Sequence, residues 1–313
     1  MDIKMKHVFI LNPAAGQNDK TGQIRDKIKS AMSGRREEYE IHTTNGPMHA
    51  IELSMQAAQS GDEVRIYACG GDGTLNEAVC GAAGYKNASV THIPAGSGND
   101  FIKIFGADAY RFLDINELID GETHEFDLIE CGDRQAINIC SVGFDARIGT
   151  EVHRYKNLPL ISGKGAYNMS VLVNFIKGIH LPYEVEADGV RFDGRYTMLV
   201  VCNGRYYGGG YCPVPEAEPD DRLLDFLLVG PVSRFTVARL ISSFSKGRWR
   251  EYPEIFKHMR GRELRVRADR ISPVNLDGER LNLREMCFRI SEKKLVFAFP
   301  RGASWKNGQN TAD

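Results

Sequence analysis

The segment VRIYACGGDGTLNEAVCGAA, residues 64–83, decides the fold of the first third of the chain. Its β-rich start at 64–68 runs through a glycine-rich loop straight into a helical pattern at 75–83. A loop in this place lies at the carboxyl end of a strand, where open α/β sheets bind their ligands. The segment therefore predicts one βα unit with a ligand site at its turn.

Units of the same kind flank this segment on both sides. Strand-like runs at 7–11, 39–43 and 90–93 alternate with helical patterns at 21–32, 50–59 and 101–105. In the first of these helical patterns, apolar residues recur every fourth position, as expected for an amphipathic helix. The alternation predicts stacked βα units and a parallel sheet.

Beyond about residue 125 the pattern changes to short strands separated by Gly, Pro and Asp turns, which is all-β in character. The expected strands are 125–131, 136–140, 183–187, 196–201, 224–229, 264–268 and 295–299, with helices at 167–179 and 234–244. We therefore expect an α/β domain over residues 1–125, to which the C-terminal segment 291–313 adds a piece, and a β-rich domain over 126–290. The polar tail from residue 302 onward is expected to fray.

Length and composition agree with a globular protein of about two domains, because 313 residues contain 42% hydrophobic and 26% charged side chains. With 40 basic and 41 acidic residues, no overall field attracts nucleic acid, and we expect no nucleic-acid partner. No apolar run approaches the roughly 18 residues that cross a bilayer, and the first residues do not resemble a signal peptide. The sequence thus predicts a cytoplasmic location.

Seven cysteines, an odd number without a C-x-x-C pair, argue against a disulfide framework or a zinc site. The eight histidines contain no H-x-x-x-H or H-x-H pair. If the protein uses a metal, oxygen ligands are therefore expected.

The loop GGDGT at 70–74 has the features of a phosphate site, because glycines admit a ligand close to the backbone and the helix N-terminus presents unpaired N–H groups. It is neither a Walker A loop nor the dinucleotide motif G-x-G-x-x-G, whose third glycine is replaced by Asn76. Asp72 would repel a phosphate directly, so it is expected to face Mg²⁺ or a ribose hydroxyl. The alternative is a plain turn with Thr74 as a helix cap.

Two further loops follow strands of the same predicted sheet, NPAAG at 12–16 and GSGND at 96–100. Each by itself could be a simple turn or a helix cap. Three such loops on one edge of a sheet favour a shared ligand site.

Five motifs together resemble the soluble diacylglycerol kinase family of lipid kinases over nearly the whole chain. They are N-P-x-x-G at 12–16, G-G-D-G-T-x-N-E at 70–77, P-x-G-x-x-N-D-F at 94–101, G-F-D-A at 143–146 and D-G-E at 277–279. The resemblance implies a Rossmann-like, parallel-sheet ATP-binding domain followed by a β-sandwich lipid-binding domain. It also implies phosphorylation of a lipid hydroxyl that depends on ATP and Mg²⁺, in the cleft between the domains.

Carried over position by position, the resemblance assigns nucleotide contacts to sixteen residues. They are Asn12, Pro13, Ala14, Ala15, Gly16, Thr44, Gly70, Gly71, Asp72, Gly73, Thr74, Leu75, Asn76, Ser97, Asn99 and Asp100. Ser97 stands where the family usually has threonine and keeps the hydroxyl. Gly98 after it is expected to loosen the loop.

The motif at 277–279 supplies the family's general base, which implies Asp277 or Glu279 in that role, with the choice open. Asp-Gly is also a strong hairpin signal, so a plain turn is the alternative. Besides Asp72, the resemblance implies a structural Mg²⁺ site formed by Asp221 and the carbonyl groups of Glu218 and Leu223. Here Arg222 replaces the usual glycine and places a positive charge beside the ion, and a solvated acidic turn is the alternative.

Residues 246–270 contain nine basic and four acidic residues, a local charge of +5. With Trp249, Tyr252 and Phe256 interleaved, this segment could dock on an anionic leaflet, which predicts peripheral contact with the inner face of the membrane. The alternative is a solvated face whose aromatic residues belong to the core.

The expected function is transfer of the γ-phosphoryl group of ATP to diacylglycerol, giving phosphatidic acid for phospholipid biosynthesis. A sphingoid base, phosphatidylglycerol or undecaprenol are the alternative acceptors. A second alternative function is that of an NAD kinase, because NAD kinases share the GGDG loop and the two-domain plan. A third is that of a lipid-binding regulator without turnover. If the protein forms an oligomer, a homodimer is expected.

Overall fold

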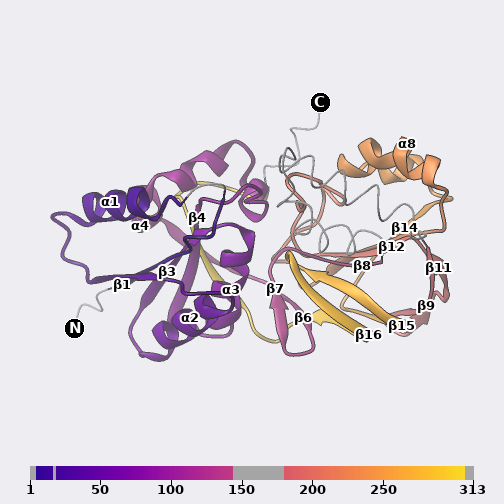
Figure 1. The fold of residues 1–313 in the computed structure, drawn as a ribbon, viewed down its shortest axis with the longest axis horizontal. Coiled ribbons are helices and arrows are strands. Elements are labelled where there is room, and N and C mark those ends of the chain that lie inside the picture. The colour runs from indigo at the N-terminus through magenta and orange to yellow at the C-terminus, as the bar shows by residue number, and fades with distance from the viewer. Residues whose placement is uncertain (1–4, 17–18, 144–179, 307–313) are drawn as a thin grey trace. The chain divides into compact units, whose positions relative to one another are not determined.

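The computed structural model describes residues 5–16, 19–143 and 180–306, which fall into two compact units (Figure 1). The first unit takes Met1–Leu128, Gln135–Ile137 and Ser291–Asp313, and the second takes Ile129–Arg134 and Asn138–Ile290. Helix 167–179, expected from the sequence, lies outside the described residues, as does most of the motif at 143–146.

A six-stranded sheet with the order β2-β1-β3-β4-β17-β5 forms the centre of the first unit. Its strands are β1 (Lys6–Leu11), β2 (Tyr39–Thr43), β3 (Val64–Gly70), β4 (Ala88–Pro94), β5 (Glu122–Phe126) and β17 (Leu295–Phe299). All neighbours pair in parallel except β17 and β5, which are antiparallel. The parallel sheet predicted from the alternating pattern is confirmed, and every residue of β3 is buried in it.

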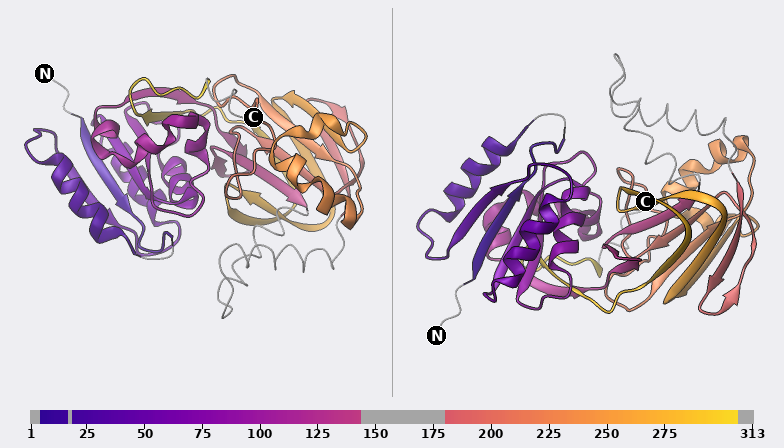
Figure 2. Two further views of the ribbon diagram at one scale, coloured as in Figure 1. Left: turned by 90° about the horizontal axis from the view of Figure 1, so that it is seen from above. Right: turned by 60° about the horizontal axis from the view of Figure 1, so that its bottom comes forward.

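Helices cover both faces of this sheet, with α1 and α4 on one side and α2 and α3 on the other (Figures 1 and 2). The helices are α1 (Thr21–Met32), α2 (His49–Gln59), α3 (Asp72–Ala82), the 3-10 helix η1 (Phe101–Leu113) and α4 (Ile115–Ile119). Helix α3 starts at Asp72, earlier than the expected residue 75. The second half of the GGDGT loop is therefore the first turn of a helix.

Aromatic rings from both ends of the first unit form one core. Phe297 of β17 lies 5.2 Å from Phe101, measured between ring centroids, and Trp305 lies 4.9 Å from Phe126. Trp305 and Ala303 are buried. The expectation that the chain frays from residue 302 is wrong for residues 302–306, because burial of the Trp305 ring holds this segment against the sheet.

Eleven strands form a separate antiparallel sheet. They are β6 (Ile129–Cys131), β7 (Arg134–Ala136), β8 (Ile139–Gly143), β9 (Leu181–Ala187), β10 (Val190–Arg191), β11 (Gly194–Tyr196), β12 (Met198–Cys202), β13 (Leu224–Val229), β14 (Phe256–Gly261), β15 (Glu263–Leu276) and β16 (Glu279–Ile290). The register of β15 shifts between Arg267 and Ser272, and its two halves pair with β9 and β8 respectively. Such an irregularity bends a strand, so one sheet can enclose a sandwich-like core. The predicted α/β fold with a β-sandwich domain is confirmed.

Several predicted strands are wrong in their limits. The expected strand 125–131 is divided, because the chain leaves the parallel sheet after β5 and joins the antiparallel sheet at β6. The expected strand 136–140 is divided between β7 and β8. Strands β14 and β16 were not predicted, because the charged residues in their sequences are typical of polar surface segments. Propensity is local and cannot show which sheet a strand enters.

Helix α8 (Arg234–Ser245) and the short 3-10 helix η2 (Arg248–Glu251) complete the second unit. Leu240 and Phe244 of α8 pack into a core cluster with residues of β12, β13 and β14, among them Val200 and Leu227. Across the described ranges, no helix combines the length and the apolar character needed to span a bilayer.

Candidate functional site

Three loops of the first unit meet at the carboxyl edge of the parallel sheet. Loop 12–16 follows β1, loop 70–74 follows β3, and loop 95–100 follows β4; these strands are parallel neighbours and so end at the same edge. The side-chain amide of Asn12 donates to Oγ1 of Thr74 at 2.9 Å. The carbonyl oxygen of Gly70 accepts the N–H groups of Ala95 at 2.7 Å and Gly96 at 3.1 Å. The fold thus brings together the three loops that the sequence analysis singled out.

The same Gly70 carbonyl oxygen lies 3.0 Å from Nε2 of His92, a buried residue of β4. A ring nitrogen can approach a carbonyl oxygen only as a donor, so Nε2 carries the proton. Burial lowers the pKa of His92 to about 4, which keeps the ring neutral. Sequence reasoning missed this residue, although a histidine inside an apolar strand was a visible signal.

Close backbone contacts explain several glycines of the loops. A Cβ atom on Gly96 would lie 2.5 Å from Cα of Gly71, and one on Gly16, whose φ is +79°, would lie 2.8 Å from the carbonyl oxygen of Ala95. A Cβ atom on Gly98 would lie 2.5 Å from Oδ2 of Asp72. Gly98 therefore lies against the Asp72 carboxylate, which gives a packing reason for a glycine at this position, and a looser loop stays a prediction.

Gly73 differs from these glycines. It is exposed, it is the second residue of α3, and apart from its chain neighbours and the backbone of its own helix no atom lies within 4 Å of the place where its Cβ would be. Protein packing therefore gives no reason for a glycine here. Open space beside the first turn of a helix leaves its N–H groups accessible to a ligand.

Asp72 faces loop 95–100. Its carboxylate accepts the backbone N–H of Asp100 and interacts with those of Asn99 and Phe101, at the start of η1. Burial raises the pKa of Asp72, and these N–H groups act against that shift by stabilising the ionised form. The carboxylate of Asp100 pairs with Lys103. Asp72 thus links α3 to the loop after β4.

The end of β2 reaches the same edge. Thr44 is buried, and its N–H donates to the carbonyl oxygen of Leu11 at 2.8 Å. Glu77 of α3 accepts the N–H groups of Met48 at 3.0 Å and Ala50 at 3.1 Å, at the start of α2. Glu77 is the last residue of the motif at 70–77, but the sequence analysis assigned it no role. In the structure its carboxylate fixes the start of α2 against α3.

The remaining predicted nucleotide contacts differ in exposure. Ser97 and Ala14 are exposed, whereas Leu75 and Asn76 are buried. The N–H of Leu75 donates to the carbonyl oxygen of Gly71 at 3.1 Å. Oδ1 of Asn76 has no hydrogen-bond partner among the described residues.

Asp277 and Gly278 form the two-residue turn between β15 and β16, with φ values of +47° and +94°. Positive φ at both positions is typical of a type I′ hairpin, so the hairpin prediction is correct. Oδ1 of Asp277 accepts the N–H of Ile139 at 2.7 Å, and Oδ2 accepts that of Asn138 at 3.0 Å. Glu279 instead lies 3.6 Å from Arg134 in an ion pair. The two candidate bases therefore differ: backbone N–H groups fix Asp277, and a charged side chain neutralises Glu279.

Asp221 does not offer a magnesium site as the chain stands. Its Oδ1 accepts the N–H of Leu223 at 2.9 Å, and its Oδ2 pairs with the Arg260 guanidinium. Residues 5–16, 19–143 and 180–306 contain no group of three or more His, Cys, Asp or Glu side chains that could hold a metal. Arg222 has a φ of +64°, which is the left-handed region where glycine is favoured. With the Asp221 carboxylate held by protein donors, Glu218, Asp221 and Leu223 do not fit the ion.

The aromatic residues of the basic segment belong to the core. Trp249 and Phe256 are buried in the cluster that α8 covers, and Tyr252 packs against it. The Arg250 guanidinium lies over the Trp249 ring at 4.1 Å, and Lys257 lies over Phe192 at 3.8 Å. The expectation that these aromatic residues meet a membrane is therefore wrong, and they belong to the core, as the alternative held.

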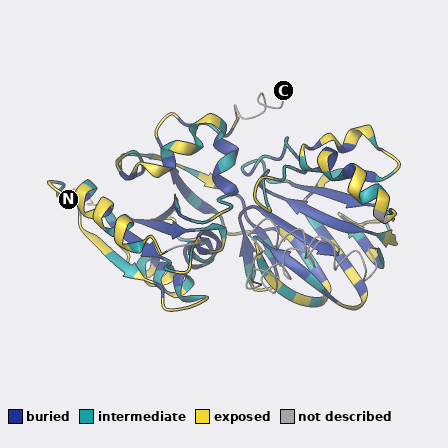
Figure 3. Cartoon of the chain, turned by 45° about the horizontal axis from the view of Figure 1, so that its top comes forward, coloured by how far each residue is buried: buried dark blue, intermediate teal, exposed yellow. Residues whose placement is uncertain are grey.

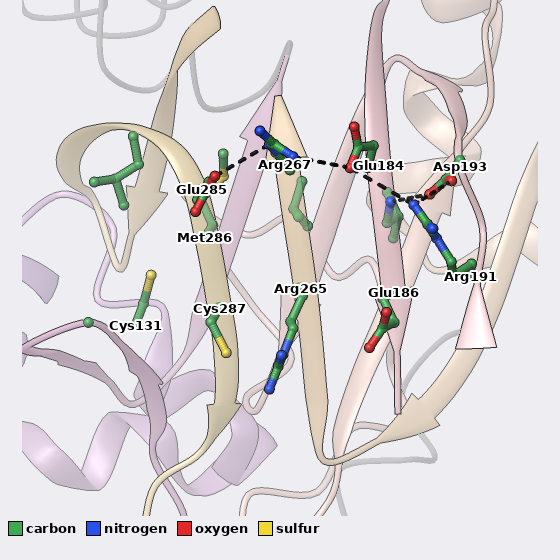
Figure 4. A pocket seen from close by; sticks show the side chains of 14 residues that line it. Cys131, Glu184, Glu186, Arg191, Asp193, Arg265, Arg267, Glu285, Met286 and Cys287 are labelled. Atoms are coloured by element: carbon green, nitrogen blue, oxygen red, sulfur yellow. Dashed lines mark hydrogen bonds and ion pairs between the residues drawn. The ribbon is translucent and has the colours of Figure 1, made fainter. Parts of the chain in front are cut away.

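A hollow of about 680 Å³ lies over β9, β15 and β16 in the second unit (Figure 4). Ion pairs cross it in a chain from Glu285 to Arg267, Glu184, Arg191 and Asp193. Because these charges neutralise one another and the hollow is open, we assign no ligand to it.

A parallel α/β unit with a glycine-lined helix N-terminus, followed by an antiparallel β unit, is the architecture of a two-domain kinase. The family model of the diacylglycerol kinase catalytic domain matches residues 6–131, and that of the YegS C-terminal NAD kinase beta sandwich-like domain matches residues 138–295. The chain belongs to the diacylglycerol kinase-like family of lipid kinases, and it is a kinase. The resemblance drawn from the five motifs is confirmed.

Relatives and solved structures agree with this family. A Pseudomonas aeruginosa protein named "Probable lipid kinase YegS-like" is 28% identical over 282 residues, covering 89% of this chain and 91% of the relative. A Shewanella frigidimarina protein of the same name is 28% identical over 75% of this chain and 76% of its own. The crystal structure of a "putative diacylglycerol kinase" from Bacillus anthracis superposes with a TM-score of 0.73 at 19% identity, covering 96% of this chain and 98% of the other. This last likeness is one of fold.

Asp72→Ala should release loop 95–100 from α3, because the Asp100 N–H loses its acceptor. Amide hydrogen exchange of the segment around Asp100 should speed up at least about tenfold, the effect of roughly 1.4 kcal/mol. Asp72→Asn keeps an acceptor oxygen and should exchange much more slowly than the alanine variant. Equal exchange in wild type and Asp72→Ala would contradict the link.

Removal of the Arg260 guanidinium, which pairs with Asp221, should make the Asp221 carboxylate available as a metal ligand. Without nucleotide, millimolar Mg²⁺ should leave the Tm of the wild-type protein unchanged, because Arg260 already neutralises the carboxylate. Arg260→Gln should lower the Tm in EDTA and regain part of it when Mg²⁺ is added, as measured by calorimetry. A saturable Mg²⁺ stabilisation of the wild type that disappears in Asp221→Asn would instead show that the ion displaces Arg260.

Proposed function

We propose that this kinase transfers the γ-phosphoryl group of ATP to a lipid hydroxyl, with diacylglycerol as acceptor and phosphatidic acid as product. The observation that carries the proposal is the joining of three loops at the N-terminus of α3, in a chain of the lipid kinase family. The names of the relatives support a lipid acceptor, and the name of the Bacillus anthracis structure supports diacylglycerol.

The loop cluster of the first unit fits the phosphate groups of ATP. The first turn of α3 has open space beside Gly73. Backbone N–H groups at a helix N-terminus stabilise phosphate charge without a side chain. In this proposal loops 12–16, 70–76 and 97–100, together with Thr44, hold the nucleotide, and bound ATP supplies the phosphoryl group.

Mg²⁺ is proposed to arrive with the nucleotide. This ion often keeps several waters and takes one or two carboxylates besides the phosphate oxygens of the substrate. Asp72 is the carboxylate that would face it, because it lies in the loop cluster and the N–H groups of residues 99–101 help to keep it ionised.

Asp277 is proposed as the base that orients the acceptor. The N–H groups of Asn138 and Ile139 fix its carboxylate, so a lipid hydroxyl could donate to an oxygen whose position is set by the backbone. As the new P–O bond forms and ADP leaves, the hydroxyl proton passes to this carboxylate. Phosphoryl transfer has a loose transition state, so positioning matters more than basicity. Because the acceptor lies in a bilayer, the enzyme is proposed to act on the inner face of the membrane from the cytoplasm.

Gly73→Ala should weaken ATP binding without harming the fold. A methyl group fits beside α3 in the protein alone, but it would occupy the space proposed for phosphate. The ATP dissociation constant, measured by calorimetric titration, should rise about tenfold or more while the Tm stays unchanged or increases, since alanine favours helix. Gly22→Ala is the matched control, because Gly22 is the second residue of α1 and also has open space around it. An unchanged ATP affinity in Gly73→Ala would contradict the phosphate assignment.

Radiolabelled phosphate transfer from ATP with Mg²⁺ tests the proposed reaction. The acceptors offered in parallel are diacylglycerol in detergent micelles, phosphatidylglycerol, a sphingoid base, undecaprenol and NAD. Diacylglycerol should be labelled, and Asp277→Asn should lower turnover by about a hundredfold or more, the usual range for a positioned acid or base, with ATP affinity retained. Glu279→Gln is the paired variant and should keep most of its activity. Label in NAD would overturn the lipid assignment, and the reverse order of the two variants would make Glu279 the base.

A further inference from the structure

Phe235, in the first turn of α8, has 89% of its surface exposed. The opposite side of the helix is well packed, since Leu240 and Phe244 belong to the core cluster of the second unit. Exposed positions alternate with buried ones along α8, and Figure 3 shows this helix with much of its surface exposed. The Phe235 ring therefore lies on the exposed face of an amphipathic helix, away from the core.

Exposed residues of α8 form a stripe with the ring at one end. Phe235, Arg239 and Ser242 of α8 and Lys246, the residue that caps its C-terminus, are all exposed and are spaced by four, three and four residues, so Lys246 continues the helix face that the other three share. Within the described ranges, Arg239 and Lys246 have no acidic partner, in contrast to Arg250, which pairs with Glu216. The α8 stripe, as we name these four residues, thus combines one apolar side chain with two unpaired cations.

The chain segment around α8 carries charge of one sign, although Arg248 and Arg250 at its end pair with Glu251 and Glu216 outside it. The segment 231–250 contains five basic residues and no acidic residue, although the whole chain is nearly neutral. Acidic residues in the first turn stabilise a helix through its dipole, and α8 has none there. The stability of α8 therefore does not explain why the segment 231–250 has basic residues and no acidic ones. A negatively charged binding partner would explain it.

We propose that the α8 stripe docks this protein on a bilayer that contains anionic lipids, with Phe235 in the interfacial region and Arg239 and Lys246 against the head groups. The proposal rests on the proposed function to the extent that a lipid acceptor requires membrane contact. Basic residues near a bilayer surface are attracted to anionic head groups, and an exposed phenyl ring beside them can enter the interfacial region, where aromatic side chains are favoured. Two of the alternative partners fit less well. A second copy of the chain in a two-fold contact would place the same positive charges against each other, and a nucleic-acid backbone gives no use for the protruding ring.

Binding to sedimented vesicles tests the proposal. Vesicles of neutral phosphatidylcholine are compared with vesicles that contain about a third phosphatidylglycerol. Wild-type protein should bind the anionic vesicles more tightly. Arg239→Gln with Lys246→Gln should lower that partition constant about 25-fold, at roughly fivefold per charge near an anionic surface, and leave neutral vesicles unaffected. Phe235→Ser should lower binding about tenfold on the anionic vesicles.

Matched controls separate the α8 stripe from general effects. Ile271→Ser removes another exposed apolar side chain of the second unit, and Lys27→Gln with Lys29→Gln removes two exposed cations from α1. These controls should bind anionic vesicles like the wild type, and all variants should keep the wild-type Tm. Equal loss in controls and stripe variants would overturn the proposal. So would a change in molar mass of Phe235→Ser by light scattering without loss of vesicle binding, which would indicate a second copy as the partner.

Kinase activity in neutral detergent micelles distinguishes the two proposals. The stripe variants should phosphorylate the micellar acceptor at the wild-type rate, because they change docking and not the loop cluster. Should the wild type bind anionic vesicles through the stripe but phosphorylate no lipid, the proposed function fails while the docking surface stands. If the wild type phosphorylates lipid but the stripe variants bind anionic vesicles like the wild type, the docking surface fails while the proposed function stands.

Discussion

The carbonyl oxygen of Gly70 holds together the loops at the carboxyl edge of the parallel sheet. It accepts the N–H groups of Ala95 and Gly96 and the Nε2–H of His92, so the end of β3 is tied to the loop after β4 by three donors. A neutral, buried imidazole can serve this purpose because its low pKa removes any charge from the middle of the sheet. The contact between Gly71 and Gly96 depends on this arrangement, since a Cβ atom on either residue would push the loops apart.

Side chains and backbone have different tasks at this edge. The side chains of Asn12, Asp72 and Glu77 contact other parts of the protein and fix the loops and helices around them. The backbone of the first turn of α3 has open space beside Gly73. In the proposed function these N–H groups bind phosphate, and Asp72, which would repel phosphate directly, faces the Mg²⁺ that accompanies it.

The sequence predicts features that depend on neighbouring residues. The limits of α1, the loops at the ends of parallel strands and the Asp277–Gly278 hairpin follow from local pattern and turn chemistry. Features that depend on distant partners were not predictable. The division between β5 and β6, the pairing of Asp221 with Arg260 and the burial of Trp249 are each set by residues that the chain brings together only on folding. A basic segment with aromatic residues thus looked like a membrane surface, whereas the exposed ring is Phe235 on the preceding helix.

The central claim is that backbone N–H groups at the start of α3 and in the joined loops bind the phosphates of ATP. Amide NMR of protein labelled with ¹⁵N-glycine tests it directly, because the loops contain Gly16, Gly71, Gly73, Gly96 and Gly98. Addition of a non-hydrolysable ATP analogue with Mg²⁺ should shift the signals of Gly71, Gly73 and Gly96 most, and the same signals should respond little in Asp72→Ala. Unchanged loop glycines, together with shifts confined to glycines of the second unit, would contradict the account.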